Sequence, residues 1–453
     1  MSADVTATSS ASSSSSSSKT PRAAASLPPE GRAALRAGVV GNLIDNIHVF
    51  LPVTALAPAM LVLAGPAATA STGALIIVAM LFGRPAGGVV FGRLADRLGR
   101  TRTTRVAIAG TALCALAIAA TPTHALLGPG TVVLILVLRF LCGIFVAGEY
   151  SAAIPLAMEW SAPRRRGLMS GLILSMAPWA QAAIAFTVAL TLALLGPAQY
   201  AAWGWRVLFV VGAALSVGML IYYSRHVVDA PVRSAAAPAT TRPPRLRAVL
   251  GGRWAGAFWA AFVLMTGLWL LTDSTVLLLT ARLGTDSSLT ASAVPVVMGI
   301  AAIAQALAMA VAGHLSSLVG RRRLLTCWGV SAMLLGPLLW WGAVHAPTLA
   351  VAALLAALLQ AATVSGYGPI AAYLSERFPA EVRSTGYGSA YSLSLVLPAL
   401  YPFYVPALEP WLGRDGTVIG MVVLGGLLVI VGARLGPRLG PRELDAPLEE
   451  VTR

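Results

Sequence analysis

The amino-acid sequence predicts an all-α membrane protein in which twelve transmembrane helices form two six-helix bundles. Three observations predict this fold class. Hydrophobic residues make up 57% of the chain and charged residues 11%, with a mean hydropathy of +0.79, whereas soluble domains carry roughly 25% charged residues. Apolar stretches long enough to cross a bilayer follow one another along the chain. A basic segment that begins at Gly92 returns 221 positions later, which indicates two related halves.

The first predicted bundle occupies residues 37–224. It consists of six apolar runs, and the breaks between them contain charged residues, glycine or proline. Each run is close to the roughly 20 residues that a helix needs to cross the hydrocarbon core. The predicted helices cover residues 37–63, 70–92, 104–121, 130–158, 168–195 and 204–224.

The second predicted bundle occupies residues 256–434 and repeats this pattern. Residues 225–255, between the two bundles, are polar, basic and contain proline, which predicts a cytoplasmic linker and a domain boundary. The predicted helices of the second bundle cover residues 256–280, 291–313, 324–344, 348–373, 385–407 and 415–434.

Both ends of the chain are predicted to be polar tails. Residues 1–36 contain an uninterrupted serine run from Ser12 to Ser18 and lack the apolar core of a signal peptide. We expect them to form a disordered tail in the cytoplasm. Residues 435–453 are expected to form a second cytoplasmic tail.

The basic residues indicate how the chain is oriented. The net charge is +15, yet the Lys and Arg residues fall in the gaps between apolar runs rather than on one folded face, which argues against nucleic-acid binding. If the N-terminus is cytoplasmic, 27 of the 32 Lys and Arg residues lie on the cytoplasmic side. The positive-inside rule therefore predicts a multi-pass protein of the cell (inner) membrane with both termini in the cytoplasm.

The repeated basic segment has one informative difference between its copies. Gly92 to Arg102 reads GRLADRLGRTR, and Gly313 to Arg323 reads GHLSSLVGRRR. The second copy places Ser317 where the first has Asp96. The two halves should therefore share a fold without sharing the same ion pair.

Several motifs together resemble the major facilitator superfamily and, within it, the metabolite:proton symporter family. The resemblance implies a central cavity between the two bundles, alternating access, and proton-coupled symport of a small metabolite such as a carboxylate, an amino acid or a betaine. It covers nearly all of the chain after residue 38. The motifs that carry it are the Gly92–Arg102 segment, Arg84-Pro85 with Gly87-Gly88, Arg139 to Gly143 with Gly148-Glu149, Trp203 to Arg206, Arg225 to Pro231, and Glu376-Arg-Phe-Pro379 with Arg383-Ser-Thr-Gly386.

The first predicted helix departs from the family pattern. The family usually has Gly-Asn, then Glu, then aromatic residues and Asp. This chain has Gly41-Asn42, keeps an acid as Asp45, and has His48 where the second acid would lie. Substrate specificity does not carry over from the family at this position.

Four ionisable residues within predicted spans are candidates for proton coupling. A charged group in hydrocarbon costs several kcal/mol, estimates starting near ~2.5, so it usually has a partner or a function. Asp45 lies about 13 Å into the first helix, near the bilayer centre. His48 follows three residues later on the same face, so the two could share a proton; alternatively, His48 only hydrogen-bonds between packed helices. The other two candidates are Arg139 and Glu149.

The roles of Arg139 and Glu149 stay open at the sequence level. The family resemblance implies a buried arginine at Arg139, which could pair with a carboxylate or bind an anionic solute. Glu149 lies about 15 Å further along the same helix on a different face, so we expect it to pair across a helix interface rather than with Arg139. Both a proton relay and a structural pair fit Glu149.

A second set of polar residues in the apolar runs could line the solute cavity. Arg84 could bind substrate, although a role in a gate or in helix packing is the alternative. Asp273 lies toward the outer end of the seventh predicted helix and could serve binding or an extracellular gate, or face water. The amides could contact a solute or join helices. The set comprises Asn42, Arg84, Gln181, Asp273, Gln305 and Gln360.

A third set is predicted to form a cytoplasmic gate. It combines the first basic segment with a second repeat, in which a glutamate precedes an arginine by seven positions in both halves. Solvated loop charge is the alternative interpretation. The gate candidates are Gly92, Asp96, Arg97, Gly99, Arg100, Glu159, Arg166, Glu376 and Arg383.

Two other functions, export and catalysis or sensing in the membrane, would require motifs that this sequence lacks or does not clearly supply. A proton-antiporting exporter of the same superfamily would commonly carry a Gly- and Pro-rich motif in its fifth helix, which Ser175-Met-Ala-Pro178-Trp179 does not clearly supply. A membrane-embedded enzyme or sensor is disfavoured because no GxSxG, HExxH or phosphate-binding glycine loop occurs.

The three cysteines have no CxxC spacing, so we expect no disulfide framework, metal or cofactor. We expect a monomer whose partners are a solute and protons.

Overall fold

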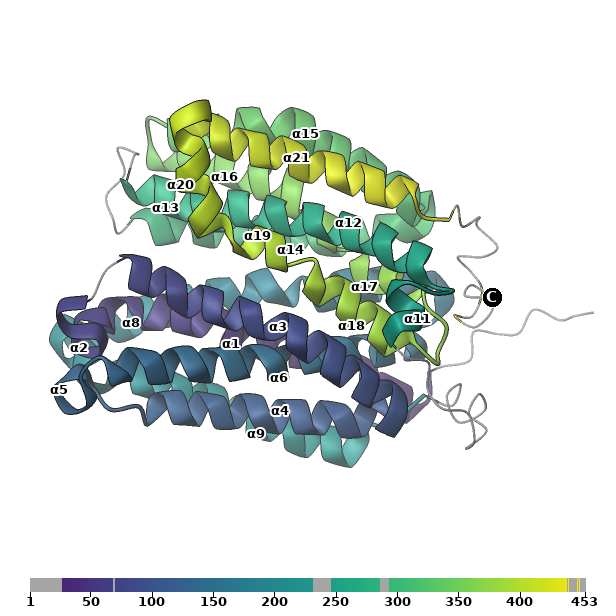
Figure 1. Cartoon of the computed structure of the whole chain (residues 1–453), viewed down its shortest axis with the longest axis horizontal. Helices are drawn as coiled ribbons and strands as arrows, with labels where there is room; N and C mark the ends of the chain where they lie inside the picture. Colours follow the sequence, from purple (N-terminus) through teal and green to yellow (C-terminus); the bar gives the residue numbers. More distant parts are fainter. Residues whose placement is uncertain are drawn as a thin grey trace, which may run out of the picture.

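The computed structural model describes residues 27–67, 70–230, 246–285 and 293–437, together with Leu439, Ala446 and Leu448. The described helices form two bundles that lie side by side (Figure 1). Helices from the first half of the sequence form one bundle, and helices from the second half form the other. The start of α1 and the end of α21 lie at the same end of the molecule, which we call the terminal end (Figure 1). The opposite end is the distal end.

The N-terminal bundle contains six long helical segments joined by short helical turns. Its elements are α1 (Pro29–Ala55), η1 (Ala57–Ala59), α2 (Met60–Ala64), η2 (Gly65–Ala67), α3 (Ala70–Leu98), α4 (Arg100–Ala119), α5 (His124–Leu127), α6 (Gly130–Trp160), η3 (Pro163–Arg165), α7 (Arg166–Leu174), α8 (Met176–Gln199), η4 (Tyr200–Gly204) and α9 (Trp205–His226).

The C-terminal bundle has more interrupted helices. Its elements are α11 (Leu246–Leu250), α12 (Ala255–Thr272), η5 (Asp273–Leu278), α13 (Leu279–Thr285), α14 (Ala293–Val319), α15 (Arg321–Val344), α16 (Leu349–Thr363), η6 (Val364–Tyr367), α17 (Ile370–Ser375), α18 (Arg383–Leu393), α19 (Val396–Ala399), α20 (Tyr401–Leu412) and α21 (Arg414–Arg434).

The described helices account for the twelve predicted crossings. Ten stretches are long and apolar enough to span a membrane, and the bent pair from Arg383 to Leu412 adds an eleventh. One of the ten, Pro163–His226, has 64 residues, which as a straight helix would be about three times the bilayer core. Gly196, with φ 74° and ψ 161°, breaks this stretch just before Pro197, so it contains two crossings.

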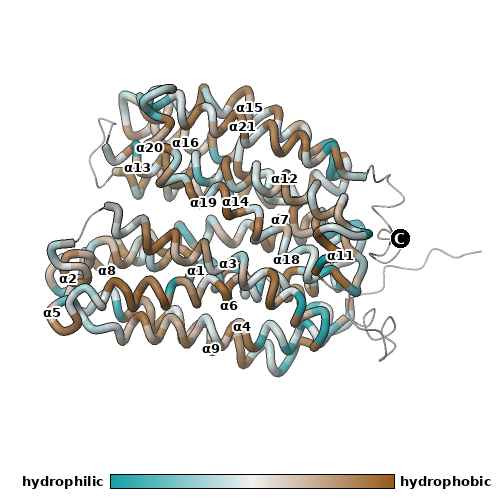
Figure 2. The backbone as a smooth tube through the Cα atoms, viewed as in Figure 1, coloured by the Kyte–Doolittle hydropathy of each residue, from teal (hydrophilic) through white to brown (hydrophobic). Residues whose placement is uncertain are grey.

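The outer surface of the bundles is apolar along the middle of the helices. Figure 2 shows hydrophobic colours there and more hydrophilic segments toward the two ends. Large apolar side chains face outward, including Leu113 at 67% and Leu338 at 71% exposure. A water-soluble protein would not expose such side chains together, so this surface is suited to contact with lipid.

Two predicted boundaries were wrong. The first helix begins at Pro29 rather than at residue 37, because proline suits the first helical position and Glu30 complements the positive end of the helix. The predicted 1–36 tail is therefore helical from Pro29 onward, while residues 1–26 lie outside the described residues. Within the predicted 225–255 linker, Leu246–Leu250 is helical, and residues 231–245 lie outside the described residues. The predicted C-terminal tail, 435–453, lies mostly outside them as well.

The repeated basic segment is mainly the end of a helix. Helix α3 continues to Leu98 and α14 to Val319, beyond the predicted ends at residues 92 and 313. The turn that follows each helix is one glycine in the left-handed region, Gly99 at φ 105° and Gly320 at φ 92°. Only glycine adopts this conformation without strain, which explains why the turn can be so short.

The two bundles touch most closely near the terminal end, where α3 packs on α18 and α7 packs on α14. Glycine permits this approach, because a Cβ added to Gly88 would lie 2.5 Å from the Gly388 carbonyl oxygen. A Cβ added to Gly313 would likewise lie 2.5 Å from the Gly167 carbonyl oxygen. Small residues at these crossings let the backbones themselves come into contact.

We predict that Gly88→Val separates the bundles at the terminal end. Carbon and oxygen need about 3.5 Å between them, so the backbones must move apart by at least roughly 1 Å. Spin labels at Arg102→Cys on α4 and Arg434→Cys on α21, in a Cys327→Ser background, should report a longer distance.

Gly218→Val is the matched control for this measurement, because a Cβ at Gly218 meets no atom within 4 Å. Its distance distribution should match that of the parent protein. Unchanged distances in Gly88→Val would contradict the assigned packing of α3 on α18.

Candidate functional site

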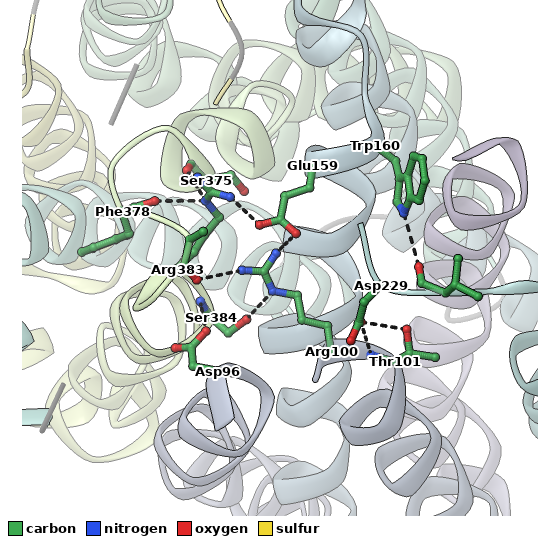
Figure 3. A network of polar contacts seen from close by, with 12 residues as sticks. Asp96, Arg100, Thr101, Glu159, Trp160, Asp229, Ser375, Phe378, Arg383 and Ser384 are labelled. Carbon is green, nitrogen blue, oxygen red and sulfur yellow. Dashed lines mark hydrogen bonds and ion pairs between the residues drawn. The ribbon is translucent and has the colours of Figure 1, made fainter. Parts of the chain in front are cut away.

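A buried ion network joins the bundles at the terminal end (Figure 3). Its centre is Glu159, at the end of α6, which forms ion pairs with Arg100 of α4 and with Arg383 of α18. Arg100 also donates from Nε to Ser384 Oγ at 3.0 Å. Arg383 donates from Nε to the carbonyl oxygen of Phe378 at 3.0 Å. One carboxylate thus holds an arginine from each bundle.

A second network has the same plan with the bundles exchanged. Glu376 accepts two hydrogen bonds from Arg321, at 2.6 Å from Nε and 2.7 Å from Nη2, and one at 3.2 Å from Arg166 Nη1 of the other bundle. Burial would raise the pKa of Glu376, but the guanidinium groups of Arg321 and Arg166 outweigh burial and hold that pKa below its ordinary value. The two networks are related as the sequence repeats are.

The sequence analysis missed one member of this second network and one of its consequences. Arg321 was part of the repeated segment but was not among the gate candidates. The comparison of Asp96 with Ser317 did not consider this pair: Arg321 binds Glu376 as Arg100 binds Glu159, so an ion pair is present in the second half at a different position of the repeat. The equivalent of Arg100 is present in the second half, and only the equivalent of Asp96 is lost.

Asp96 binds the beginning of α18 across the bundle interface. Its carboxylate oxygens accept from the backbone N–H of Ser384 at 3.1 Å, from that of Thr385 at 2.8 Å and from Thr385 Oγ1 at 2.7 Å. Helix N-termini present free N–H groups and a partial positive charge, so a carboxylate stabilises them. Ser317, on α14, lies beside Gly167 near the start of α7. Its hydroxyl has no hydrogen-bond partner among the described residues.

The remaining gate candidates shape the turn rather than the ion network. A Cβ on Gly92 would lie 2.8 Å from the Ser384 carbonyl oxygen, and one on Gly99 would lie 2.6 Å from Asp229 Oδ2. Arg97 is exposed at the end of α3. Asp229, which sequence reasoning did not select, accepts from the Thr101 N–H at 2.9 Å and so caps α4 (Figure 3). Asp229 belongs to the Arg225 to Pro231 motif quoted above, two residues before Pro231, but the motif alone did not indicate this contact.

Two proton-coupling candidates meet inside the N-terminal bundle. Asp45 on α1 and Glu149 on α6 line the same small cavity, and both residues are about 95% buried. Thr111 Oγ1 donates to Glu149 Oε1 at 3.4 Å. This cavity, of about 10 Å³, is also lined by Tyr223, and it is close to the volume that one water needs.

His48 and Arg139 are not part of this pair. His48 Nε2 is hydrogen-bonded to Ser216 Oγ of α9 at 2.7 Å, so the predicted pairing of Asp45 with His48 was wrong. The i, i+3 spacing places the two residues on one broad face of α1. The His48 side chain nevertheless contacts α9, whereas the Asp45 side chain lies beside α6. The histidine therefore joins packed helices, as its alternative interpretation stated.

Arg139 binds backbone oxygens instead of a carboxylate. It donates from Nη1 to the His48 carbonyl at 3.0 Å and from Nη2 to the Val49 carbonyl at 3.3 Å. Pro52 lies inside α1 and has no N–H, so the His48 carbonyl lacks its usual helical donor. Arg139 supplies the missing donor and thereby braces the proline-containing end of α1.

Asn42 takes part in a polar cluster next to the carboxyl pair. Tyr150 Oη donates to Asn42 Oδ1 at 3.0 Å, and Asn46 Nδ2 donates to Tyr150 Oη at 2.8 Å. The Asn42 amide also donates to the Ile173 carbonyl at 2.8 Å. Tyr150 stacks on Tyr391 of the other bundle, with 5.2 Å between ring centroids. The cluster therefore connects α1 with the bundle interface.

Arg84 lies in the middle of that interface, surrounded by aromatic rings of both bundles. It is 4% exposed. Its guanidinium carbon lies 5.0 Å from the ring centroid of Tyr150, 5.3 Å from that of Trp269 and 5.7 Å from that of Tyr391. These are cation–π distances. Arg84 also lies within electrostatic range of Asp45.

The C-terminal bundle contributes three polar candidates that are more than 90% buried. Asp273 begins the π-helical turn η5 and is 3% exposed. Gln360 donates from Nε2 to the Thr275 carbonyl of that turn at 3.3 Å. The amide oxygens of Gln305 and Gln360 have no hydrogen-bond partner among the described residues. Gln181, on α8 of the other bundle, is half-buried and has no described contact with these groups.

Among the described residues, no three His, Cys, Asp or Glu side chains gather in a way that could hold a metal ion. The chemistry that the described groups can perform is the binding and release of protons, ions and polar solutes. This matches an arrangement whose polar groups lie inside and between two apolar bundles.

Comparison with known proteins agrees with the fold and the motifs. The family model described as Major Facilitator Superfamily matches residues 46–402. The inner membrane metabolite transport protein YhjE of Escherichia coli is 28% identical over 87% of this chain and 92% of its own length. An alpha-ketoglutarate permease of Escherichia coli is 28% identical over 69% of this chain and 71% of its own. A proline/betaine transporter of Escherichia coli is 32% identical over 32% of this chain and 29% of its own.

Solved structures share the architecture at low sequence identity. The proton:xylose symporter XylE has a TM-score of 0.74 at 17% identity, covering 93% of this chain and 98% of that one. The fucose:proton symporter FucP of Escherichia coli has a TM-score of 0.65 at 14% identity, covering 89% of this chain and 97% of that one. The predicted fold and the resemblance to metabolite:proton symporters are confirmed. The chain belongs to the Major Facilitator Superfamily, and it is a multi-pass membrane protein and a secondary active transporter.

Proposed function

We propose that this protein couples the uptake of a small organic solute to protons, with the Asp45–Glu149 pair as the proton site. The single observation that carries the proposal is that these two buried carboxyl side chains, from α1 and α6, line the same small cavity inside the N-terminal bundle. Two carboxylates buried at one site repel each other when both are ionised, so such a site favours binding of a proton. Titration of the pair would add a negative charge inside the N-terminal bundle.

Arg84 is positioned to couple that charge to the bundle interface. It feels the charge of Asp45 and at the same time contacts Trp269 and Tyr391 of the C-terminal bundle. When the pair loses its proton, the attraction of Arg84 toward Asp45 increases and its hold on the aromatic rings weakens. Proton release can thus favour separation of the bundles on one side.

We assign the terminal end to the cytoplasm, as the positive-inside rule favours, and the two ion networks to a cytoplasmic gate. In the arrangement described above, the gate is closed by Glu159, Glu376 and Asp96. Opening toward the cytoplasm requires breaking all three sets of contacts. Under this proposal both termini face the cytoplasm, the protein resides in the inner membrane, and the transporting unit is a monomer.

Asp45→Asn and Glu149→Gln should abolish proton-coupled flux. In proteoliposomes with an imposed proton gradient, we expect accumulation of the solute to fall at least about 100-fold, because the proton site is lost. Solute exchange without a gradient should persist, since exchange needs no net proton movement. Flux is measured in both right-side-out and inside-out vesicles, which distinguishes symport from antiport.

The matched control for these variants is Asp415→Asn, which removes a carboxylate that pairs with Arg282 inside the C-terminal bundle. It should transport like the parent protein. Normal gradient-driven accumulation in Asp45→Asn and Glu149→Gln would contradict the assigned proton site.

Asp96→Asn and Ser317→Ala should differ strongly although they occupy equivalent positions. Asp96→Asn removes the charge that binds the N-terminus of α18, typically worth about 0.5–2 kcal/mol, so the gate should open more readily and transport should fall severalfold. Ser317→Ala removes a hydroxyl that has no described partner and should be nearly silent. Equal transport rates for the two variants would contradict the asymmetric gate.

Glu376→Gln should destabilise the protein in a pH-dependent way. At neutral pH it leaves Arg321 and Arg166 without their carboxylate, a loss on the order of 3–5 kcal/mol for a buried pair, so the purified protein should melt at a lower temperature. Because the pKa of Glu376 in the folded protein is lowered, its stabilisation is complete above the unfolded pKa of about 4.3 and is lost as the pH falls through the folded pKa.

The melting-temperature difference between parent and Glu376→Gln should therefore be constant near neutral pH and narrow in acid. Glu381→Gln, at an exposed neighbouring glutamate, should melt like the parent at every pH. A difference that stays constant into strong acid would mean that the charge of Glu376 does not stabilise the gate.

A further inference from the structure

Arg84 has a hydrogen-bond donor, Nε, that no group of the described residues accepts. Its Nε lacks a hydrogen-bond partner, and no carboxylate forms an ion pair with it among the described residues. Asp45 lines a separate small cavity together with Glu149 inside the N-terminal bundle. The aromatic rings around Arg84 compensate its charge only in part. A carboxylate that bound this buried arginine would accept its unpaired hydrogen-bond donor and neutralise its charge.

Asp273, in the C-terminal bundle, has a hydrogen-bond acceptor without a donor among the described residues. It is 3% exposed, its Oδ2 has no hydrogen-bond partner, and no arginine, lysine or histidine in the described part of the chain pairs with it. Glu159, the other carboxylate whose oxygen lacks a hydrogen bond, is held by ion pairs. Asp273 also begins a π-helical turn, and such turns occur frequently at functional sites.

Trp269 places these two groups close together. Asp273 follows it by four residues, one helical turn on the same face, which brings their Cβ atoms within about 6 Å. The Arg84 guanidinium lies 5.3 Å from the Trp269 ring. The Tyr367 ring lies 5.6 Å from it on another side, and Tyr367 is within electrostatic range of Asp273. A cation from one bundle therefore lies over the ring of Trp269, and an anion of the other bundle follows one turn later on the helix that carries this tryptophan.

A second acceptor without a donor lies near this centre. Gln305 on α14 is 7% exposed and its Oε1 has no hydrogen-bond partner. The Ser365 hydroxyl, two residues before Tyr367, donates to the Gln305 backbone carbonyl at 3.5 Å. Leaving such buried groups unsatisfied is unfavourable for each of them. A ligand that supplied N–H donors on this side and an acceptor at Arg84 would satisfy all three residues.

We propose that the transported solute carries a carboxylate, bound by Arg84, and an ammonium group with N–H bonds, bound by Asp273 and Gln305. This inference rests on the proposed transport function. The solute class is that of amino acids. A trimethylammonium compound has no N–H to donate, and the aromatic faces that could hold it are occupied by Arg84. A dicarboxylate would place its second negative charge against Asp273.

Analogues that differ at one group test this assignment. The purified full chain is screened by thermal shift and by radioligand displacement with amino acids, and for each amino acid that binds, with its N-trimethyl, deaminated and decarboxylated analogues. We expect each analogue to bind about 10- to 100-fold more weakly than the amino acid, the effect of losing one charge-assisted hydrogen bond.

Two variants then locate the groups. Asp273→Asn should weaken binding of the amino acid by a similar factor while leaving the deaminated acid unchanged. Arg84→Gln should weaken both. Asp415→Asn, whose carboxylate lies outside the centre, should alter neither. If Asp273→Asn does not yield folded protein, the N-methylation series on the parent protein decides alone.

The outcomes separate this inference from the proposed function. Tightest binding of a trimethylammonium compound or a dicarboxylate, with proton-driven flux of that solute, overturns the inference and leaves the proposed function standing. Absence of proton-driven flux for every solute class overturns the proposed function itself.

Discussion

Glu159 and Glu376 each bind one arginine from their own bundle and one from the other, and the closed end of the molecule depends on these contacts. A buried guanidinium that loses its carboxylate is destabilised by several kcal/mol. The bundles therefore cannot part at this end unless water enters and solvates four arginines and two glutamates. The direct backbone approach of Gly88 and Gly388 ensures that the networks form only when the helices are in contact.

The two networks are equivalent, yet the ends of the helices beside them are not. Asp96 binds the N-terminus of α18, while the corresponding Ser317 leaves the N-terminus of α7 without a carboxylate. A carboxylate at a helix N-terminus gains both hydrogen bonds and a favourable interaction with the helix dipole. The α18 side of the interface is thus held by charge as well as by packing, which makes this end of the bundle interface asymmetric.

Under the proposed function, the interior separates proton binding from solute binding while keeping them connected. Asp45 and Glu149 lie within one bundle, and Asp273 lies within the other. Arg84 contacts rings of both bundles and feels the charge of Asp45. Arg139, in contrast, donates to the His48 carbonyl that Pro52 leaves without a helical donor, and to the Val49 and Ile76 carbonyls. Of the two intramembrane arginines, Arg84 is the one that we propose responds to both proton and solute.

The sequence by itself determined the number of crossings, the duplication and the set of ionisable residues inside the bilayer, because hydrophobic length and charge placement are local properties of the chain. It could not assign partners. The i, i+3 spacing suggested that Asp45 and His48 could share a proton. Helix packing instead places Asp45 beside Glu149 and His48 in a hydrogen bond with Ser216. Nor could the sequence show that Arg321 forms an ion pair with Glu376 in the half where Ser317 stands in place of an aspartate. Such contacts join residues from distant segments, and only the way the twelve helices pack decides which side chains meet.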